Sequence, residues 1–221
     1  MEHLRVANPT ARVVIVGLGG GSLTSYISRH YKEAKMTSIE IDQEMVNVAK
    51  KYFNFKTDKN SDVQVADGLN ISMDNQVDLL VLDVGQTDPS LSLQYPPEIF
   101  VQSETLEMWR RCLTDNGIIA INLICREKSQ IAEIIKKCRK CFKHCFVLNC
   151  DQDANKIIIL SNCDKLKNGL LDGGKTIQSH CCLSDSEAEK VYFMLSTMTW
   201  FCSHFFVCES CGKNIFFLTI F

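Results

Sequence analysis

The feature that most constrains the fold of this chain is a short apolar run that leads directly into a glycine-rich loop. The run is Val13-Val14-Ile15-Val16, and the loop is Gly17-Leu18-Gly19-Gly20-Gly21-Ser22. A β-branched run without polar positions is typical of a strand that is buried on both faces. We expect Ser22 to cap a helix that ends near His30. Strand, loop and helix in this order predict a site for a nucleotide-like ligand, because backbone amides can approach such a ligand closely there.

Downstream of this unit, short apolar runs alternate with amphipathic segments as far as about residue 161. The expected strands that follow are 37–41, 63–66, 79–82, 118–123, 145–148 and 157–160. The expected helices are 43–52, capped by Asp42, then 98–113 and 129–141. The last two strands are close enough in sequence to form an antiparallel hairpin. The alternation predicts an α/β fold with seven strands, five of them parallel, and helices that cover the sheet.

Acidic residues stand at the carboxyl ends of three of the expected parallel strands. Glu40, Asp67 and Asp83 close the second, third and fourth strands, and Gly68 follows Asp67. In an open α/β sheet, ligands bind outside the carboxyl ends of the strands, where the strand order reverses. The sequence therefore predicts a ligand site that combines the glycine-rich loop with these carboxylates.

Two cofactor classes compete for this site. The dinucleotide fingerprint G-x-G-x-x-G/A would place Gly or Ala at position 22, where the chain has Ser. The observed spacing is instead G-x-G-x-G, at Gly17, Gly19 and Gly21. Glu40 suits the ribose of either NAD or S-adenosylmethionine, but Asp67 can accept a hydrogen bond from an adenine amino group and leaves no role for a second nucleotide. These residues favour S-adenosylmethionine over NAD; a glycine turn that serves only tight packing is the remaining alternative.

Composition argues against nucleic-acid and membrane partners. Lys and Arg number 24 against 26 Asp and Glu, a net charge of −2, whereas a nucleic-acid-binding domain usually carries a basic excess. The basic run at 136–143 is therefore interpreted as a solvated helix face. The first ten residues hold Glu2 and Arg5 and no apolar run, so we expect no secretory signal, reduced cysteines and a cytoplasmic location. The apolar stretch 191–207 contains hydroxyl residues and is shorter than the roughly 20 apolar residues of a membrane span.

Two further motifs are interpreted as coincidences. Residues 169–176 satisfy the phosphate-loop pattern G-x-x-x-x-G-K-[ST], but no strand precedes them and no amphipathic helix follows. Two C-x-x-C pairs, Cys138/Cys141 and Cys208/Cys211, have the spacing of zinc half-sites. Cys138 falls on the apolar stripe of helix 129–141, where a free cysteine acts as a small apolar residue. We therefore expect neither a metal site nor a nucleoside triphosphate site.

Several segments, in order along the chain, carry a resemblance to a known family. Residues 14–23, 39–42 and 66–69 together resemble the spermidine-synthase-like branch of the class I methyltransferases, in which the position two residues before the first glycine, Ile15 here, is not acidic. Further segments look like the C-terminal methyltransferase domain of the methyltransferase-like protein 13 family: Asp83-Val84, Asp88-Pro89, Pro96-Pro97, Phe100-Val101 and residues 122–126. The resemblance covers about residues 11–163. It implies a Rossmann-like methyltransferase domain at 1–163, followed by a divergent tail at 164–221.

The resemblance implies S-adenosylmethionine as the cofactor. The residues implied to bind it are Gly17, Gly19 and Gly21 at the methionine part, Glu40 at the ribose, and Ile41, Asp67 and Gly68 at the adenine. The family methylates elongation factor 1-alpha, through this type of domain at the N-terminal α-amine and through a separate domain at a lysine. The implied acceptor is therefore the α-amine, and the lysine activity does not carry over to this chain.

The resemblance also implies a catalytic carboxylate and an acceptor wall. Asp83 is the implied catalytic residue, which holds the incoming amine or accepts its proton. Asp88, Tyr95 and Pro96 are implied to line the acceptor side. Gly85 stands where a carboxylate is expected, and this departure from the family pattern would weaken the orientation of the acceptor.

Two alternatives to methyl transfer remain open. An aminopropyltransferase that acts on a polyamine resembles this chain in its sheet and uses a related cofactor, but that branch has D-x-x-D-P in the loop after the fourth strand. Here Asp83 and Asp88-Pro89 are separated by four residues, and the ten residues before Ala11 are too few for the N-terminal β-domain of that branch. The second alternative is a cofactor-binding scaffold that regulates a partner without catalysis.

Overall fold

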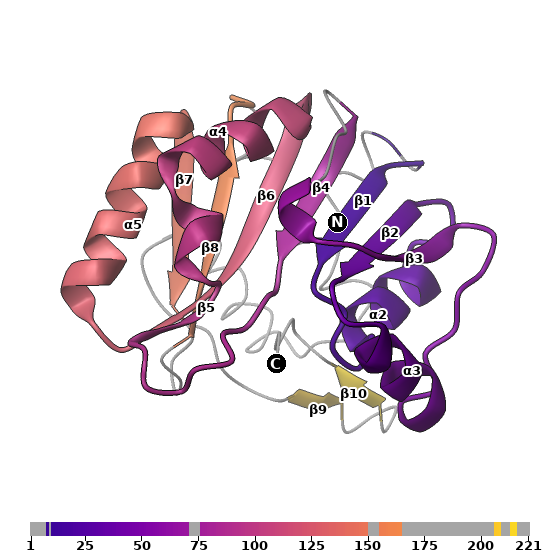
Figure 1. Ribbon diagram of the computed structural model, residues 1–221. Helices are drawn as coiled ribbons and strands as arrows, with labels where there is room; N and C mark the ends of the chain where they lie inside the picture. The colour runs from indigo at the N-terminus through magenta and orange to yellow at the C-terminus, as the bar shows by residue number, and fades with distance from the viewer. Residues whose placement is uncertain are drawn as a thin grey trace.

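The computed structural model describes Asn8, residues 10–70, 76–149 and 155–164, and two short strands at 206–208 and 213–215. Figure 1 shows the main sheet with the helices packed around it. The phosphate-loop-like stretch 169–176, the apolar residues 191–205 and Cys211 lie outside the described residues.

The main sheet has the strand order β3-β2-β1-β4-β6-β8-β7. The bounds are β1 Arg12–Val16, β2 Lys35–Glu40, β3 Ser61–Val65, β4 Val77–Leu82, β6 Leu113–Cys125, β7 His144–Asn149 and β8 Asn155–Ser161. The strands from β3 to β6 in this order are parallel, and β8 runs antiparallel to both of its neighbours, β6 and β7. The expected α/β sheet with five parallel strands and a final antiparallel hairpin is confirmed. The order of the strands reverses between β1 and β4.

An eighth strand, β5 (Leu93–Tyr95), joins this sheet within the segment after β4, where the sequence predicts no strand. It pairs antiparallel with the end of β6, where Leu93 lies opposite Cys125 and Tyr95 opposite Ile124. A three-residue strand carries no detectable period of its own, so pairing with β6 rather than local preference forms it. A separate antiparallel pair is made by β9 (Phe206–Cys208) and β10 (Lys213–Ile215).

The helices bury both faces of the sheet. The bounds are α2 Ser22–His30, α3 Gln43–Tyr52, α4 Ser103–Cys112 and α5 Lys128–Cys141, with single 3-10 turns at η1 Gly68–Asn70 and η2 Glu98–Val101. Trp109 of α4 and Ile134 of α5 share one core cluster with Val14 of β1, and Figure 1 shows α4 and α5 side by side over the part of the sheet that holds β6 to β8. Ile27 of α2 lies in a second cluster with Ile15. Because neighbouring residues of β1 enter opposite clusters, the predicted burial of this strand on both faces is confirmed.

Some local expectations are corrected by the structure. No side chain caps α2: the N-cap residue is Gly21, in a left-handed conformation, so Ser22 is the first helical residue rather than the cap. The tight turn of the glycine-rich loop moves the cap position back by one residue. The expected helix 98–113 is divided into η2 and α4 by the extended backbone at Gln102. Asp42 does cap α3, because its side chain accepts a hydrogen bond from the amide of Glu44 at 2.8 Å.

Neither metal-binding clusters nor membrane spans occur in the described part of the chain. No group of three His, Cys, Asp or Glu residues is arranged to hold a metal ion there. Among the same residues, no helix combines the length and the apolar character needed to cross a membrane. Cys138 of α5 is fully buried in the core, as expected of a small apolar residue.

Candidate functional site

A cavity of about 910 Å³ opens at the carboxyl ends of β1, β2 and β4. Its position is the predicted one, where the order of the strands reverses. The predicted site residues that line it are Gly17, Gly19, Glu40, Ile41, Asp67, Gly68, Asp83 and Tyr95. Three predicted site residues, Gly21, Asp88 and Pro96, are not among the lining residues.

The glycine-rich loop can approach a ligand because its own neighbours leave no room for side chains. Gly17 has a φ of 94°, and a Cβ atom there would lie 2.3 Å from the carbonyl oxygen of Asp83. Gly21 has a φ of 75°, and a Cβ atom there would lie 2.5 Å from the Phe55 ring. Only glycine adopts such backbone without strain. Gly21 therefore supports the loop by packing on Phe55 instead of facing the cavity.

The Glu40 carboxylate connects the end of β2 to this loop. One of its oxygens, Oε2, accepts a hydrogen bond from the amide of Leu18 at 3.0 Å, and the other, Oε1, accepts one from the amide of Asp42 at 3.1 Å. Because two backbone amides hold it, the side chain is oriented before any ligand arrives. Ile41, the next residue, is 70% exposed at the rim of the cavity.

The third strand contributes an acid and a glycine to the same wall. Asp67 accepts a hydrogen bond on Oδ1 from the amide of Leu69 at 2.9 Å. Gly68 is buried, and a Cβ atom there would lie 2.3 Å from Cγ1 of Val16. Gly68 therefore lets the chain after β3 close against β1, which brings Asp67 to the cavity.

Asp83 lies at the end of β4, and its backbone and side chain are held by different strands. Its amide donates to the carbonyl of Val16 in β1 at 2.9 Å. Its Oδ1 accepts a hydrogen bond from Nδ2 of Asn122 in β6 at 2.9 Å. Burial raises the pKa of Asp83 to about 6, against the opposing effect of the hydrogen bond from Asn122. A carboxylate with this pKa is mostly ionised at neutral pH and is a stronger base than an exposed aspartate.

The loop after β4 brings one of its three predicted residues to the cavity. Tyr95 lines it, and a Cβ atom on Gly85 would lie 2.7 Å from Cζ of the Tyr95 ring. The Tyr95 ring therefore occupies the space that a side chain at position 85 would need. Asp88 is exposed and turned into the loop, where its carboxylate accepts two hydrogen bonds from Ser90, which lower its pKa. Pro96 is buried after the cis peptide bond that follows Tyr95.

Sequence reasoning missed the apolar side chains of the cavity and the partner of Asp83. Met45 and Phe53 line the cavity from the start and the end of α3. The Phe53 ring lies against Gly20, where a Cβ atom would be 3.0 Å from Cδ1. Phe53 is 60% exposed, and an apolar ring exposed directly after a helix is the signal that could have identified it. For Asn122, the signal is an amide inside the otherwise apolar run at residues 118–123.

Acidic side chains dominate the charge of the cavity. Glu40, Asp42, Asp67 and Asp83 line it, and no Lys, Arg or His is among the lining residues that the structure describes. Such a lining favours a cationic ligand and disfavours the pyrophosphate of a dinucleotide, because like charges repel more strongly where water is partly excluded. The residues present therefore fit the sulfonium group of S-adenosylmethionine better than they fit NAD.

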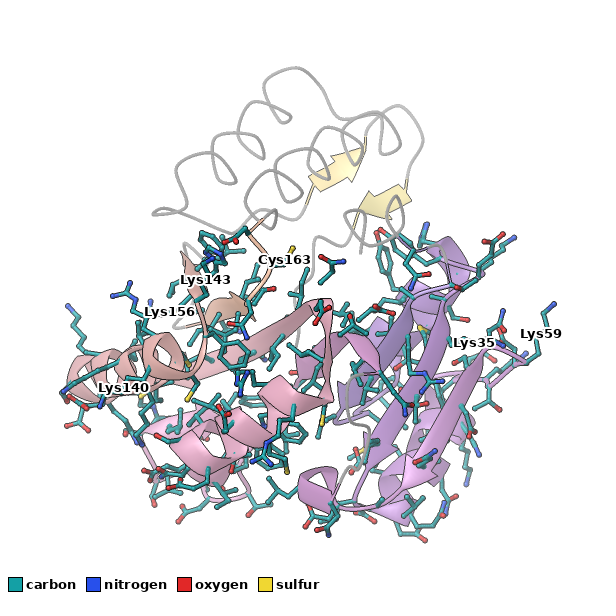
Figure 2. The ribbon with its side chains drawn as sticks, turned by 90° about the horizontal axis from the view of Figure 1, so that it is seen from above. Lys35, Lys59, Lys140, Lys143, Lys156 and Cys163 are labelled. Atoms are coloured by element: carbon teal, nitrogen blue, oxygen red, sulfur yellow. The ribbon has the colours of Figure 1, made fainter. Side chains whose placement is uncertain are left out.

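The basic side chains lie elsewhere on the molecule. Figure 2 shows the labelled lysines on two outer flanks: Lys140, Lys143 and Lys156 at α5 and the β7–β8 hairpin, and Lys35, the first residue of β2, with Lys59, just before β3. None of these lysines is among the residues that line the cavity, whereas four acids are.

Comparison with known families agrees with this geometry. Residues 3–166 match the family model described as the spermine/spermidine synthase domain. The chain belongs to the spermine/spermidine synthase domain family. This member of the family is 33% identical over 160 residues to the eEF1A lysine and N-terminal methyltransferase homolog of Drosophila melanogaster, a match that covers 70% of this chain and 24% of that protein. It is 32% identical over 154 residues to the eEF1A lysine and N-terminal methyltransferase of Xenopus laevis, covering 67% of this chain and 22% of that protein.

A solved structure shows the same fold. Human methyltransferase-like protein 13 in complex with SAH superimposes with a TM-score of 0.69 and 24% sequence identity, covering 89% of this chain and 85% of that chain. The resemblance that the motifs indicated is therefore confirmed. This member of the spermine/spermidine synthase domain family spans about a quarter of the length of the curated relatives that it matches.

Proposed function

We propose that this protein transfers a methyl group from S-adenosylmethionine to the N-terminal α-amine of elongation factor 1-alpha. The observation that carries the proposal is the acidic cavity at the reversal of the strand order, with a partly buried carboxylate of raised pKa, Asp83, among its lining residues. The relatives that this chain matches, which are named eEF1A lysine and N-terminal methyltransferases, support this acceptor.

The cavity divides into two parts, which we name by their tasks. The donor half consists of the lining residues 16–69, and the acceptor half consists of the lining residues 83–100. In the donor half, Gly17 and Gly19 would contact the methionine part, with Gly21 supporting them from behind. The Glu40 carboxylate would accept hydrogen bonds from the ribose hydroxyls. Ile41, Asp67 and Gly68 would enclose the adenine.

In the acceptor half, Asp83 has two tasks. When bound, S-adenosylmethionine supplies an electrophilic methyl group on a positively charged sulfur. The Asp83 carboxylate attracts the acceptor ammonium group and takes one proton from it, so that the nitrogen lone pair becomes free to attack. The proton then passes from Asp83 to solvent. Tyr95 forms the adjoining wall, with Pro96 and Asp88 fixing the loop behind it.

The lower pKa of an α-amine makes it easier for Asp83 to deprotonate than a lysine side chain. An α-amine has a pKa of about 7.7–8.0, and a lysine side chain has one of about 10.4. Transfer of a proton to a carboxylate with a pKa of about 6 therefore costs roughly 2.5 kcal/mol from an α-amine and roughly 6 kcal/mol from a lysine, at about 1.36 kcal/mol per unit. The difference of about 3.5 kcal/mol corresponds to a several-hundred-fold preference.

A second candidate function is aminopropyl transfer to a polyamine, which the name of the family model favours. A polyamine carries several ammonium groups and calls for several carboxylates along its path. The acceptor half has a single acid among its lining residues, Asp83. Its other lining residues, such as Gly85 and Tyr95, carry no carboxylate. This arrangement suits one amine at the end of a peptide. A scaffold that binds the cofactor without transferring any group is the third hypothesis.

Transfer of an isotopically labelled methyl group distinguishes the three hypotheses. The wild-type chain and Asp83→Asn are incubated with labelled S-adenosylmethionine and a peptide that carries the N-terminal sequence of elongation factor 1-alpha, with the N-acetylated peptide as control. We expect label on the free peptide only, and only with the wild-type chain. Transfer from decarboxylated S-adenosylmethionine to putrescine would instead indicate the aminopropyltransferase. Cofactor binding without any transfer would indicate the scaffold.

We also propose the domain limits and the location. Residues 1–163 would form the catalytic domain, and residues 164–221 a separate tail. A cytoplasmic location would follow from the acceptor, which works in translation. A fusion of the chain to a fluorescent protein, viewed by microscopy, tests the location, and assay of a chain truncated after residue 163 tests the limits.

A further inference from the structure

A buried amide stands beside the reacting carboxylate, outside the set of residues that line the cavity. We infer that Asn122 is a positioning residue, which holds the Asp83 carboxylate in the orientation that receives the acceptor amine. The inference rests on the proposed function, because the orientation of Asp83 matters for catalysis only if an amine reacts there.

The geometry fixes Asp83 from two sides. The backbone of Asp83 is bonded to β1 through the carbonyl of Val16 at 2.9 Å. The side chain is bonded to β6 through Nδ2 of Asn122, also at 2.9 Å. These two strands lie on either side of β4, so the carboxylate is clamped between elements that cannot move independently. An aspartate on a free loop would have neither constraint.

The surroundings of Asn122 in β6 are those of an apolar core residue. Asn122 is only 1% exposed, and its neighbours in β6, Ile121 and Leu123, are fully buried. An amide at such a place costs free energy unless it is hydrogen-bonded, whereas an apolar residue would fit the strand without that cost. The hydrogen bond to Asp83 offsets the free-energy cost of burying the amide, and the amide in turn orients the Asp83 carboxylate.

The chemistry of the amide suits a base. An amide donates a hydrogen bond without adding a positive charge, so it orients the carboxylate and leaves it attractive to an ammonium group. A lysine or arginine at this position would neutralise Asp83 and lower its basicity further. The other titratable groups of the cavity are Glu40, Asp42 and Asp67 from the ends of β2 and β3, and Tyr95 from β5; β1 contributes only Val16 and the glycine-rich loop. Asn122 is thus a neutral partner in an acidic surrounding.

Substitution with leucine tests the inference, because leucine has a similar volume and no donor. The ionisation of Asp83 is followed by carbon-13 NMR of its carboxyl group in the wild-type chain and in Asn122→Leu, with Asp83→Asn to assign the signal. We expect the pKa of Asp83 to rise by about one unit in Asn122→Leu, since a hydrogen bond to the ionised form is lost. The acidic limb of the kcat profile should move by the same amount, while KM for S-adenosylmethionine stays within about twofold.

Ser161→Ala is the matched control. Its hydroxyl is fully buried and donates to the carbonyl of Gly117 at 2.7 Å, away from Asp83. We expect this variant to lose stability without any change in the titration of Asp83. If Asn122→Leu does not fold, Asn122→Ala is judged by the same titration.

An Asp83 titration in the leucine or alanine variant that matches the wild-type chain would overturn the inference. So would a shift of equal size in Ser161→Ala, because general loosening of the sheet would then explain it. The NMR readout requires no turnover. A wild-type chain that fails to transfer a methyl group therefore contradicts the proposed function and leaves the contact between Asn122 and Asp83 to be judged by its own measurement.

Discussion

The donor half and the acceptor half of the cavity are built in different ways. In the donor half, the Glu40 carboxylate is held by backbone amides of Leu18 and Asp42, all of them at the ends of neighbouring elements near the start of the chain. In the acceptor half, the Asp83 carboxylate is held by the side chain of Asn122, 39 residues away. In the donor half, backbone amides orient the carboxylate, one of them 22 residues away along the chain, whereas in the acceptor half a side chain from strand β6 orients the reacting carboxylate.

The largest effect is expected from breaking the acceptor half alone. Asp83→Asn removes the group that attracts and deprotonates the amine, so we expect methyl transfer to fall by about a thousandfold. The donor half is untouched, and the affinity for S-adenosylmethionine should stay within about threefold. Single-turnover transfer together with calorimetric binding measures both. A variant that keeps a tenth of the wild-type rate would show that Asp83 only fixes the loop.

The next effect comes from breaking the donor half at its closest approach. Gly17→Ala places a Cβ atom 2.3 Å from the Asp83 carbonyl, at a φ of 94°. We expect a loss of about 3 kcal/mol in the free energy of unfolding, measured by urea denaturation, and no detectable cofactor binding. Gly19→Ala is the control for folding, since a Cβ atom there meets nothing within 4 Å, and it should lose only about 1 kcal/mol. Equal losses in the two variants would contradict the account.

Removal of Glu40 sharpens the comparison, because it weakens binding without altering the reacting group. Glu40→Ala deletes the acceptor for the ribose and releases the amides of Leu18 and Asp42. We expect the affinity for S-adenosylmethionine to fall by about 50-fold, while the rate at saturating cofactor stays within about threefold. Glu44→Ala, an exposed acid in the first turn of α3, serves as the control and should bind normally. Unchanged affinity in Glu40→Ala would remove Glu40 from the site.

The difference in stability between Asp83→Asn and the wild-type chain should depend on pH, in a direction that the raised pKa of Asp83 determines. Burial raises the pKa of Asp83 from 3.8 to about 6, so the folded state binds the proton more tightly than the unfolded state. The resulting stability is present below pH 3.8 and is lost as the pH rises through about 6. Asn cannot ionise, so Asp83→Asn should be more stable than the wild-type chain by about 3 kcal/mol at pH 8 and equal to it near pH 3. Thermal unfolding at the two pH values checks this, and a destabilised variant at pH 8 would contradict it.

The smallest effect is expected at the wall of the acceptor half. A Cβ atom at Gly85 would lie 2.7 Å from the Tyr95 ring, so Gly85→Ala should displace Tyr95 and raise KM for the peptide by about tenfold. The affinity for S-adenosylmethionine should not change. Tyr95→Ala removes the same wall directly and should raise KM by a similar factor. If Gly85→Ala raised KM and Tyr95→Ala did not, the ring would not be the wall.

The sequence predicted the residues of the donor half more completely than those of the acceptor half, because most donor residues stand at the ends of predictable strands. The residues Gly17, Gly19, Glu40 and Asp67 sit at strand ends that hydrophobic patterning locates, and parallel strands bring their carboxyl ends together. Tyr95 could be expected at the cavity only through the family resemblance, because β5 exists only by pairing with β6.

Two other features of the site could not be predicted from local sequence patterns. The face of α3 was one of them: Met45, Val48, Ala49 and Tyr52 share a helical period, yet Val46 and Ala49 are buried while Met45 lines the cavity. The packing of α3 against the glycine-rich loop, and not its own period, decides which residues are covered. The bond between Asn122 and Asp83 depends on the neighbouring positions of β4 and β6 in the sheet, which no single segment specifies.

A crystal structure of the chain with S-adenosylmethionine tests the central claim most directly. We expect the adenine between Ile41 and Asp67, the ribose hydroxyls on Glu40, and the sulfonium methyl group directed toward Asp83. An empty cavity at saturating ligand, or a ligand bound with its methyl group turned away from Asp83, would contradict that claim.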